Sequence, residues 1–203
     1  MAKIRKTAFK KHLTTLTREE MEAEMLKLFD KYKQVQDHYT QDLGDEQTRA
    51  ALLEEYKKKL NAALRVGLGL KISTIKIRQI IAEFKQTSVF PYDLTQLMFH
   101  RIKLAVQFWD KTEDPYDVSS SFTSATYTAF TDFCKMVAAH ALHAYFDKEV
   151  ETLINADYND IDLEDFIPIY NEHYGKKFPR EYVNRQSFWS WTLPIVVRDD
   201  NEE

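Results

Sequence analysis

Arg101 is the residue whose position most clearly raises a chemical question. On a helical wheel of residues 94–109, apolar side chains cover more than half of the circumference, and Arg101 lies inside that arc, between Leu94 and Phe108. A guanidinium there needs a carboxylate or several carbonyl groups, because an unpaired buried charge costs several kcal/mol. An anion clamp in a groove would fit, but we expect a structural role. That role would be an ion pair between helices or a side chain that reaches solvent at the helix edge.

A second group of residues has the composition, but not the geometry, of a zinc site. His140 and His143 form a His-x-x-His pair, and Asp132, Cys134 and Asp147 are near them in the sequence. Zinc needs at least three convergent ligands, whereas the two histidines lie about 60° apart around a helix and no glutamate follows the first. We therefore expect a core histidine that is hydrogen-bonded to a backbone carbonyl, and we expect no metal site.

Two further segments resemble ligand-binding loops only in part. The acidic run Asp157–Asp165 lacks the glycine and the glutamate that a calcium loop needs at its sixth and twelfth positions. Gly67 and Gly69 form a Gly-x-Gly without a preceding strand or a third glycine, so they do not indicate a dinucleotide site. P-loop and Gly-x-Ser-x-Gly motifs are also absent. The sequence predicts no cofactor and gives no positive sign of an enzyme.

A basic stripe is the main argument for nucleic-acid binding. Lys71, Arg78 and Lys85 recur every seven residues, so they share one helix face, and Lys76 lies beside them. Basic residues near the N-terminus would extend this surface: Lys3, Arg5, Lys6, Lys10 and Lys11. Such a surface could follow a phosphate backbone, but no aromatic residues are interleaved for base stacking. We expect a solvated helix face and keep nucleic-acid association as the alternative.

The C-terminal segment differs from the rest of the chain. Residues 188–197 are aromatic and β-branched, with Trp189 and Trp191 at their centre, and an acidic tip follows them. Pro194 prevents a regular helix and restricts any strand to a sheet edge. So apolar a segment is expected to bind in a groove, either on its own helical body or on a second copy, and we favour its own body.

Composition limits the class of protein. The chain has 203 residues, of which 44% are hydrophobic and 30% charged, as in globular proteins. Only 4 Gly and 5 Pro are present, which favours helices with short connections over turn-rich folds. The single cysteine, Cys134, excludes an internal disulfide and fits a reducing compartment, so we expect a cytoplasmic protein. No apolar run is long enough to cross a bilayer, and we expect no membrane association.

Charge is unevenly divided along the chain. Residues 1–109 contain 20 Lys and Arg against 13 Asp and Glu, whereas residues 110–203 contain 8 against 19. This asymmetry could steer an acidic partner to the first half or pair two copies head to tail. We expect the simpler explanation, that solvated helix faces differ in composition.

The first half of the chain reads as helices with clear start signals. A short basic helix is expected over residues 6–13, and Thr17 with Glu20 forms a capping box for the next helix. Asp45 and Ser73 are expected to cap two later helices. Their core faces contain Leu53, Tyr56, Leu60 and Leu64 in one case, and Ile77, Ile80, Ile81 and Phe84 in the other. The second helix has an apolar stripe: Met21, Met25, Leu28, Phe29 and Tyr32.

The second half continues with further helices. A helix is expected over residues 94–109, and a longer helical stretch over 119–143. The apolar face then changes phase, which predicts a break within 142–147 and a cap at Asp147. Asp162 is expected to cap a last helix that ends at Gly175, with Pro168 kinking it or delaying its start. On the surface, Glu54–Lys58 and Glu55–Lys59 are expected to pair across one helical turn.

The opening segment resembles an uncharacterised bacterial family of small helical proteins, a domain of unknown function. The resemblance follows a Lys-x-x-Phe-Lys-x-x-Leu helix, a Leu-x-x-Glu-Glu helix and a Lys-Phe/Tyr-x-x-Val continuation. The matching residues are Lys6, Phe9, Lys10, Leu13, Leu16, Glu19, Glu20, Lys31, Tyr32 and Val35. It extends loosely over residues 1–155. The resemblance implies an all-helical, HEAT-like arrangement and assigns no functional residue.

Together these patterns predict an all-α protein. Residues 1–175 would form one domain, an antiparallel helical bundle or a short HEAT-like stack, and residues 176–203 an extended tail. The expected function is non-enzymatic binding of another protein, or of a second copy, by a helical scaffold. The candidate binding residues are Arg101, Lys71, Lys76, Arg78, Lys85, Trp189 and Trp191.

Overall fold

The structure is a computed structural model that describes residues 4–65, 73–110, 120–156 and 163–179. Within these ranges it is all-α, with no strand, which confirms the fold class expected from the sequence. The α-helices are α1 Lys6–Leu13, α2 Arg18–Lys31, α3 Lys33–Leu43, α4 Glu46–Arg65, α5 Thr74–Thr87, α6 Pro91–Asp110, α7 Ser120–Ala139, α8 His143–Asn155 and α9 Phe166–His173. A 3₁₀ turn, Leu163–Asp165, precedes α9.

Three helices, α2, α4 and α5, start where the sequence provides a side-chain cap. Thr17 and Glu20 form the expected capping box at α2, with each side chain bonded to the other residue's backbone N–H. Asp45 accepts a hydrogen bond from the backbone N–H of Thr48 at 2.7 Å. Ser73 accepts one from the N–H of Lys76 at 3.2 Å. All three caps are confirmed, because each depends only on local spacing.

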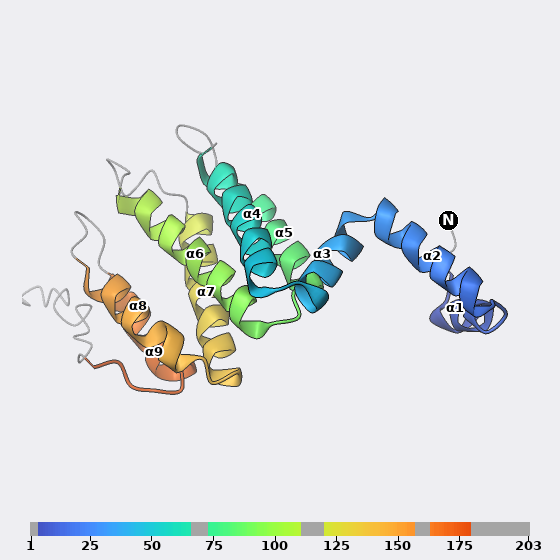
Figure 1. Cartoon of the computed structure of the whole chain (residues 1–203). Helices are drawn as coiled ribbons and strands as arrows, with labels where there is room; N and C mark the ends of the chain where they lie inside the picture. Colours follow the sequence, from blue (N-terminus) through green and yellow to red (C-terminus); the bar gives the residue numbers. More distant parts are fainter. Residues whose placement is uncertain (1–3, 66–72, 111–119, 157–162, 180–203) are drawn as a thin grey trace, which may run out of the picture.

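Helices α4–α9 pack side by side into a body that contains the hydrophobic core (Figure 1). The core faces expected for α4 and α5 are confirmed, apart from Ile81, which is only partly buried. Aromatic rings fill the centre of the body, with Phe99 stacked on Phe133 and Phe130 stacked on Phe166. Burial of each large apolar side chain contributes about 1.5–3 kcal/mol, so this cluster dominates the stability of the body.

Three helix limits differ from the expected ones. α6 begins at Pro91, because proline fits the first turn of a helix, where its missing N–H has no partner to lose. α7 ends at Ala139 and α8 starts at His143, since Ala141 has a φ of 52° and breaks the helix before the expected point. Asp147 therefore lies inside α8 and does not cap it.

The last helix begins at Phe166, later than expected, and Asp162, its expected cap, lies outside the described residues. Pro168 is compatible with this start. It lies in the first turn of α9, which begins at Phe166 and is followed by Tyr174 and Gly175. Gly175 has a φ of 82°, the left-handed conformation that commonly ends helices. The chain then returns over the body, where Phe178 is buried and its N–H bonds to the Asn171 side chain.

Of the two surface ion pairs expected on α4, one is present and the other has a different lysine partner. Lys59 pairs with Glu55 at 3.1 Å, as expected. Glu54 pairs with Lys57 at 2.7 Å, three residues away, and not with Lys58. Both spacings bring side chains together on a helix, so local rotamers decide between them.

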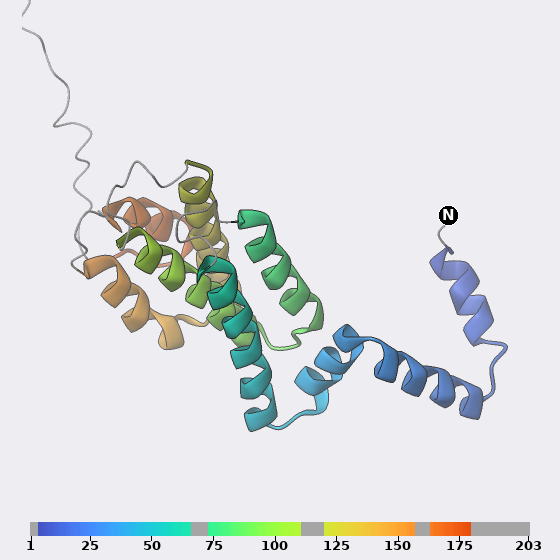
Figure 2. The same ribbon diagram turned by 90° about the horizontal axis from the view of Figure 1, so that it is seen from above.

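Helices α1 and α2 form an arm that extends away from the body (Figure 1). Neither helix contains a buried residue. The two helices meet in an open V at their connection (Figure 2). Helix α3 joins the arm to the body through an elbow at Tyr32, whose extended φ and ψ of −120° and 111° end α2 and begin α3. The arm therefore adds exposed surface and little to the core.

Candidate interaction surface

The arm presents the most apolar exposed surface among the described helices. On α2, Met25 is 46% exposed and Leu26 is 59% exposed, and on α1 Phe9 is 51% exposed. Met21 and Phe29 of α2 are also exposed, as are Ile4 before α1 and Tyr32 after α2. Single exposed apolar side chains are normal, but a contiguous set along one helix indicates a binding surface. Methionine suits such a surface, because it is flexible and polarizable.

Charges along α2 are segregated by position. Its first half carries four glutamates, at 19, 20, 22 and 24, against Arg18. Its second half carries Lys27 and Lys31 against Asp30. The acidic start is favourable at the positive end of the helix dipole, and the lysines are favourable at the negative end. The apolar stripe of α2 therefore runs from an acidic half of the helix into a basic half.

A buried polar network holds the elbow to the body. Asp37 of α3 is only 4% exposed. It accepts hydrogen bonds from the Tyr56 hydroxyl of α4 at 2.9 Å and from Lys33 Nζ at 3.1 Å. Burial, followed by these contacts with Asp37, raises the pKa of Tyr56, so the phenol stays a donor. Lys33 also pairs with Glu55 at 3.3 Å, which adds a second link from α3 to α4.

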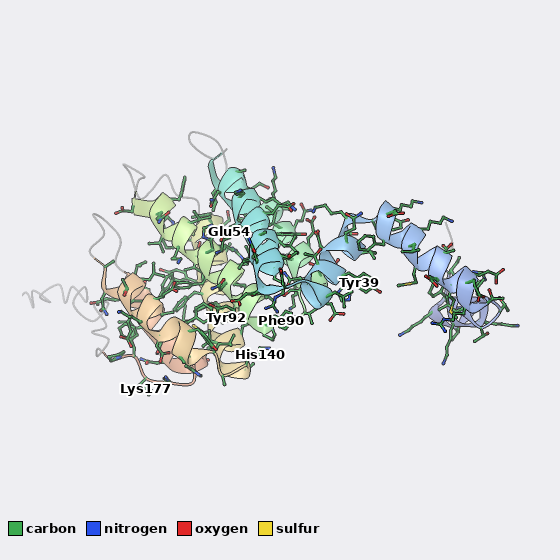
Figure 3. All side chains as sticks on the ribbon, viewed as in Figure 1. Tyr39, Glu54, Phe90, Tyr92, His140 and Lys177 are labelled. Carbon is green, nitrogen blue, oxygen red and sulfur yellow. The ribbon has the colours of Figure 1, made fainter. Side chains whose placement is uncertain are left out.

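The arm side of the elbow is held more loosely. The Gln36 side chain donates a hydrogen bond to the Phe29 carbonyl at 2.9 Å. The Phe29 and Tyr39 rings are in tilted contact with centroids 6.3 Å apart, and Figure 3 labels Tyr39 on α3 where the arm meets the body. These contacts use one side of Phe29 and leave it 39% exposed. The stripe towards Met21 therefore stays accessible.

Arg101 is half-buried between helices, and its Nη2 donates a hydrogen bond to the Ala125 carbonyl at 3.0 Å. Within the described part of the chain it forms no ion pair, so the expected inter-helix ion pair is not found there. Burial lowers the pKa of Arg101, the charge of Arg78 acts in the same direction, and Asp132 opposes both. The cavity beside it measures about 10 Å³, which suits one water molecule and not a phosphate.

The other predicted binding residues are only partly placed. Lys76, Arg78 and Lys85 are exposed on α5, and Arg78 is near enough to Arg101 to influence its pKa. Lys71 lies outside the described residues, as do Trp189 and Trp191. The basic stripe on α5 is therefore a solvated face, and its binding to nucleic acid stays a prediction.

The histidines of the second candidate group have separate environments. His143 bonds through Nε2 to the Tyr174 carbonyl at 2.7 Å, as expected, but His140 is exposed in the turn after α7. His140 is not a core residue because α7 ends one residue before it. Cys134 is buried, and burial raises its pKa. Among the residues that the structure describes, no three potential ligands converge on a metal-sized site.

A shallow concavity of about 670 Å³ follows one face of α7. Its lining includes Thr128 and Thr131, whose hydroxyls donate to backbone carbonyls one turn earlier at 2.8 and 3.0 Å. These bonds keep both hydroxyls directed along their own helix. The concavity therefore does not present them as convergent groups for chemistry on a substrate.

The sequence identified the stripe on α2 but not its exposure. Spacing shows which residues of a helix share a face, and it is silent on whether another helix covers that face. One signal was present, since α2 places charges on both sides of a methionine-containing stripe.

The matched family covers the arm and the body together. The model of a family of unknown function, DUF6155, matches residues 4–173, which agrees with the resemblance of the opening segment to an uncharacterised helical family. No curated protein and no solved structure matches the chain. None of the described helices is both long enough and apolar enough to span a membrane.

Proposed function

The chain belongs to the DUF6155 family, and we propose that it is a non-enzymatic protein-binding scaffold whose α1–α2 arm is the binding surface. The observation that carries this proposal is the complete lack of buried residues in two amphipathic helices that lie within the matched family region. Amphipathic helices are stabilised when their apolar face is covered, and short isolated helices are marginal in water. A protein partner supplies that cover.

The body has the properties of a support for this arm. Its core is continuous from α4 to Phe178, and the Asp37–Tyr56 contact fixes α3 to it. The elbow therefore gives the arm a defined exit from a stable domain. Such preorganisation lowers the entropy lost when a partner binds. In line with the single, buried Cys134, we place this binding in the cytoplasm.

Site-specific photocrosslinking tests the proposal. A photoreactive phenylalanine derivative is introduced at Met25 in the full-length chain, produced in cells that make the protein naturally. The matched control carries the same group at Gln107, which is exposed on α6 of the body. We expect a protein adduct from position 25 that is absent from position 107, because Met25 lies in the exposed apolar stripe of α2, whereas Gln107 is a polar residue on the body.

Two results would contradict this function. If position 25 gives no protein adduct, the arm is not occupied by a protein. If both positions give the same adducts, the contact is nonspecific. Salt-dependent retention on heparin that is lost after Arg78→Glu and Lys85→Glu would instead favour the nucleic-acid alternative.

A further inference from the structure

We propose that the occupant of the arm is a second copy of this chain, with α2 packed antiparallel against the α2 of that copy. The inference rests on the proposed function, that the arm binds protein, and it adds the identity and the direction of the partner. Its support comes from the spacing of the stripe, the order of charges along α2, and the position of the arm outside the body.

The stripe has the spacing of a helix–helix seam. Met21, Met25, Leu28 and Tyr32 follow one another at intervals of four, three and four residues. This is the alternation that places apolar residues in the seam of a two-helix coiled coil. In an antiparallel pair of α2 helices, Met25 lies opposite Leu28 of the second copy, and Met21 lies opposite the end of that helix, where Tyr32 follows Lys31. The stripe is therefore complementary to its own reverse.

The charges select the antiparallel direction. A parallel pair would place the acidic first halves of both α2 helices side by side, where like charges repel. The antiparallel pair instead places the acidic half of each copy beside the basic half of the other. In the heptad set by the stripe, Glu24 and Lys31 occupy equivalent flanking positions, so Glu24 faces Lys31 of the second copy. Two-fold symmetry produces this contact twice.

The contacts already present on α2 do not block this pairing. Glu24 is 3.5 Å from Lys27 in the same helix, but both side chains are largely exposed, and such pairs contribute little. Lys31 Nζ lies over the Tyr32 ring, 5.3 Å from its centroid, and this contact does not involve another helix. Small rotamer changes are enough to exchange either contact for one across the interface.

The arm is also accessible to a second copy. It leaves the body at α3 and extends clear of α4–α9 in both ribbon views (Figures 1 and 2). A single helix pair is at the small end of specific interfaces, so we expect a dimer that dissociates on dilution.

Charge exchange in the purified full-length chain tests the proposal. The molar mass is measured by sedimentation equilibrium over about 1–200 µM, a range that spans weak and moderate dimers. We expect the unmodified chain to dimerise reversibly. Glu24→Lys and Lys31→Glu, each alone, should raise the dissociation constant about tenfold or more, because two like-charged contacts replace two attractive ones. A mixture of the two variants should restore the dimer as a heterodimer.

The controls separate this arrangement from others. Glu83→Lys reverses an exposed charge on α5 of the body and should leave the dimer unchanged. Circular dichroism of each variant verifies that helix content is kept. A monomeric unmodified chain overturns the proposal, and so does a dimer that ignores both charge reversals. A dimer lost only when residues 180–203 are removed would also overturn it, because the occupant would then be the tail.

Failure here and failure of the proposed function have different signatures. A monomeric chain that still gives an adduct with a different protein at Met25 overturns the self-association and leaves protein binding by the arm intact. A dimer whose formation protects Met25 from all other adducts supports both. A chain that is monomeric and gives no adduct overturns both.

Discussion

Replacing Tyr56 with phenylalanine should destabilise the protein by removing a single hydroxyl group. The hydroxyl donates to the buried Asp37 carboxylate at 2.9 Å, and Tyr56 is only 2% exposed. The ring contacts persist in the variant, because the edge contact with Phe84 and the position of Lys59 over the ring need no hydroxyl. The change therefore isolates one hydrogen bond.

The expected magnitude follows from the charge and burial of the acceptor. A hydrogen bond to a charged group contributes about 1.5–3 kcal/mol, about twice a neutral one. Lys33 remains near Asp37 at 3.1 Å, but it is largely exposed and cannot replace a donor from inside the body. We therefore expect Tyr56→Phe to lower the free energy of unfolding by about 1.5–3 kcal/mol.

Urea-induced unfolding, followed by circular dichroism, measures this difference. Tyr145→Phe is the matched control, because Tyr145 is 62% exposed and its loss of a hydroxyl should change the free energy of unfolding by less than about 0.5 kcal/mol. A double-mutant cycle with Asp37→Ala then gives the coupling between the two side chains. If Tyr56→Phe costs no more than Tyr145→Phe, the buried network does not anchor the elbow and the reasoning is wrong.

Three other predictions concern the body. Arg101→Leu should lower the free energy of unfolding by less than about 1 kcal/mol, or should raise it, because the Ala125 carbonyl only partly compensates a buried guanidinium. A urea titration that shows a loss above about 2 kcal/mol would contradict this. Gly175→Ala should cost about 1 kcal/mol and Gly175→Asn less, since asparagine tolerates a φ of 82°, and equal melting temperatures would refute the helix-end role. Burial raises the pKa of Tyr170 and Tyr174, so folded protein keeps protons that the unfolded chain loses near pH 10. Stability should therefore be full below about pH 10 and fall above it, and a flat unfolding free energy to about pH 11 would contradict this.

Local signals made much of the body predictable from the sequence. Thr17, Asp45 and Ser73 cap helices through hydrogen bonds that span three residues, and no distant contact is needed to specify them. The buried edge of α4 was equally clear, because Tyr56 and Leu60 recur at helical spacing. Both kinds of signal depend on residue types at short spacings, which can be read directly from the sequence.

Tertiary choices were not predictable in the same way. Ala141 adopts a positive φ that alanine rarely takes, and nothing in its residue type marks the break. Asp37 gave no sign of burial, since its partner Tyr56 lies 19 residues away. The place of Arg101 between helices was anticipated, but its bond to the Ala125 carbonyl depends on how α7 lies against α6. These features are set by packing between elements, so a one-dimensional pattern leaves them open.

The arm combines both kinds of information. Its capping box and its stripe are local and were predicted, yet a 14-residue helix with only these supports is marginal in water. Contacts with α3 order the end near Phe29, whereas the end near Met21 depends on Thr17 and Glu20. A partner that covers the stripe would therefore also stabilise the arm helices. Binding and helix stabilisation would be measured together. For this reason, amide hydrogen exchange in α2 should slow as the concentration of the chain rises through its dissociation constant. Exchange in α2 that is independent of concentration while the dimer forms would place the interface elsewhere.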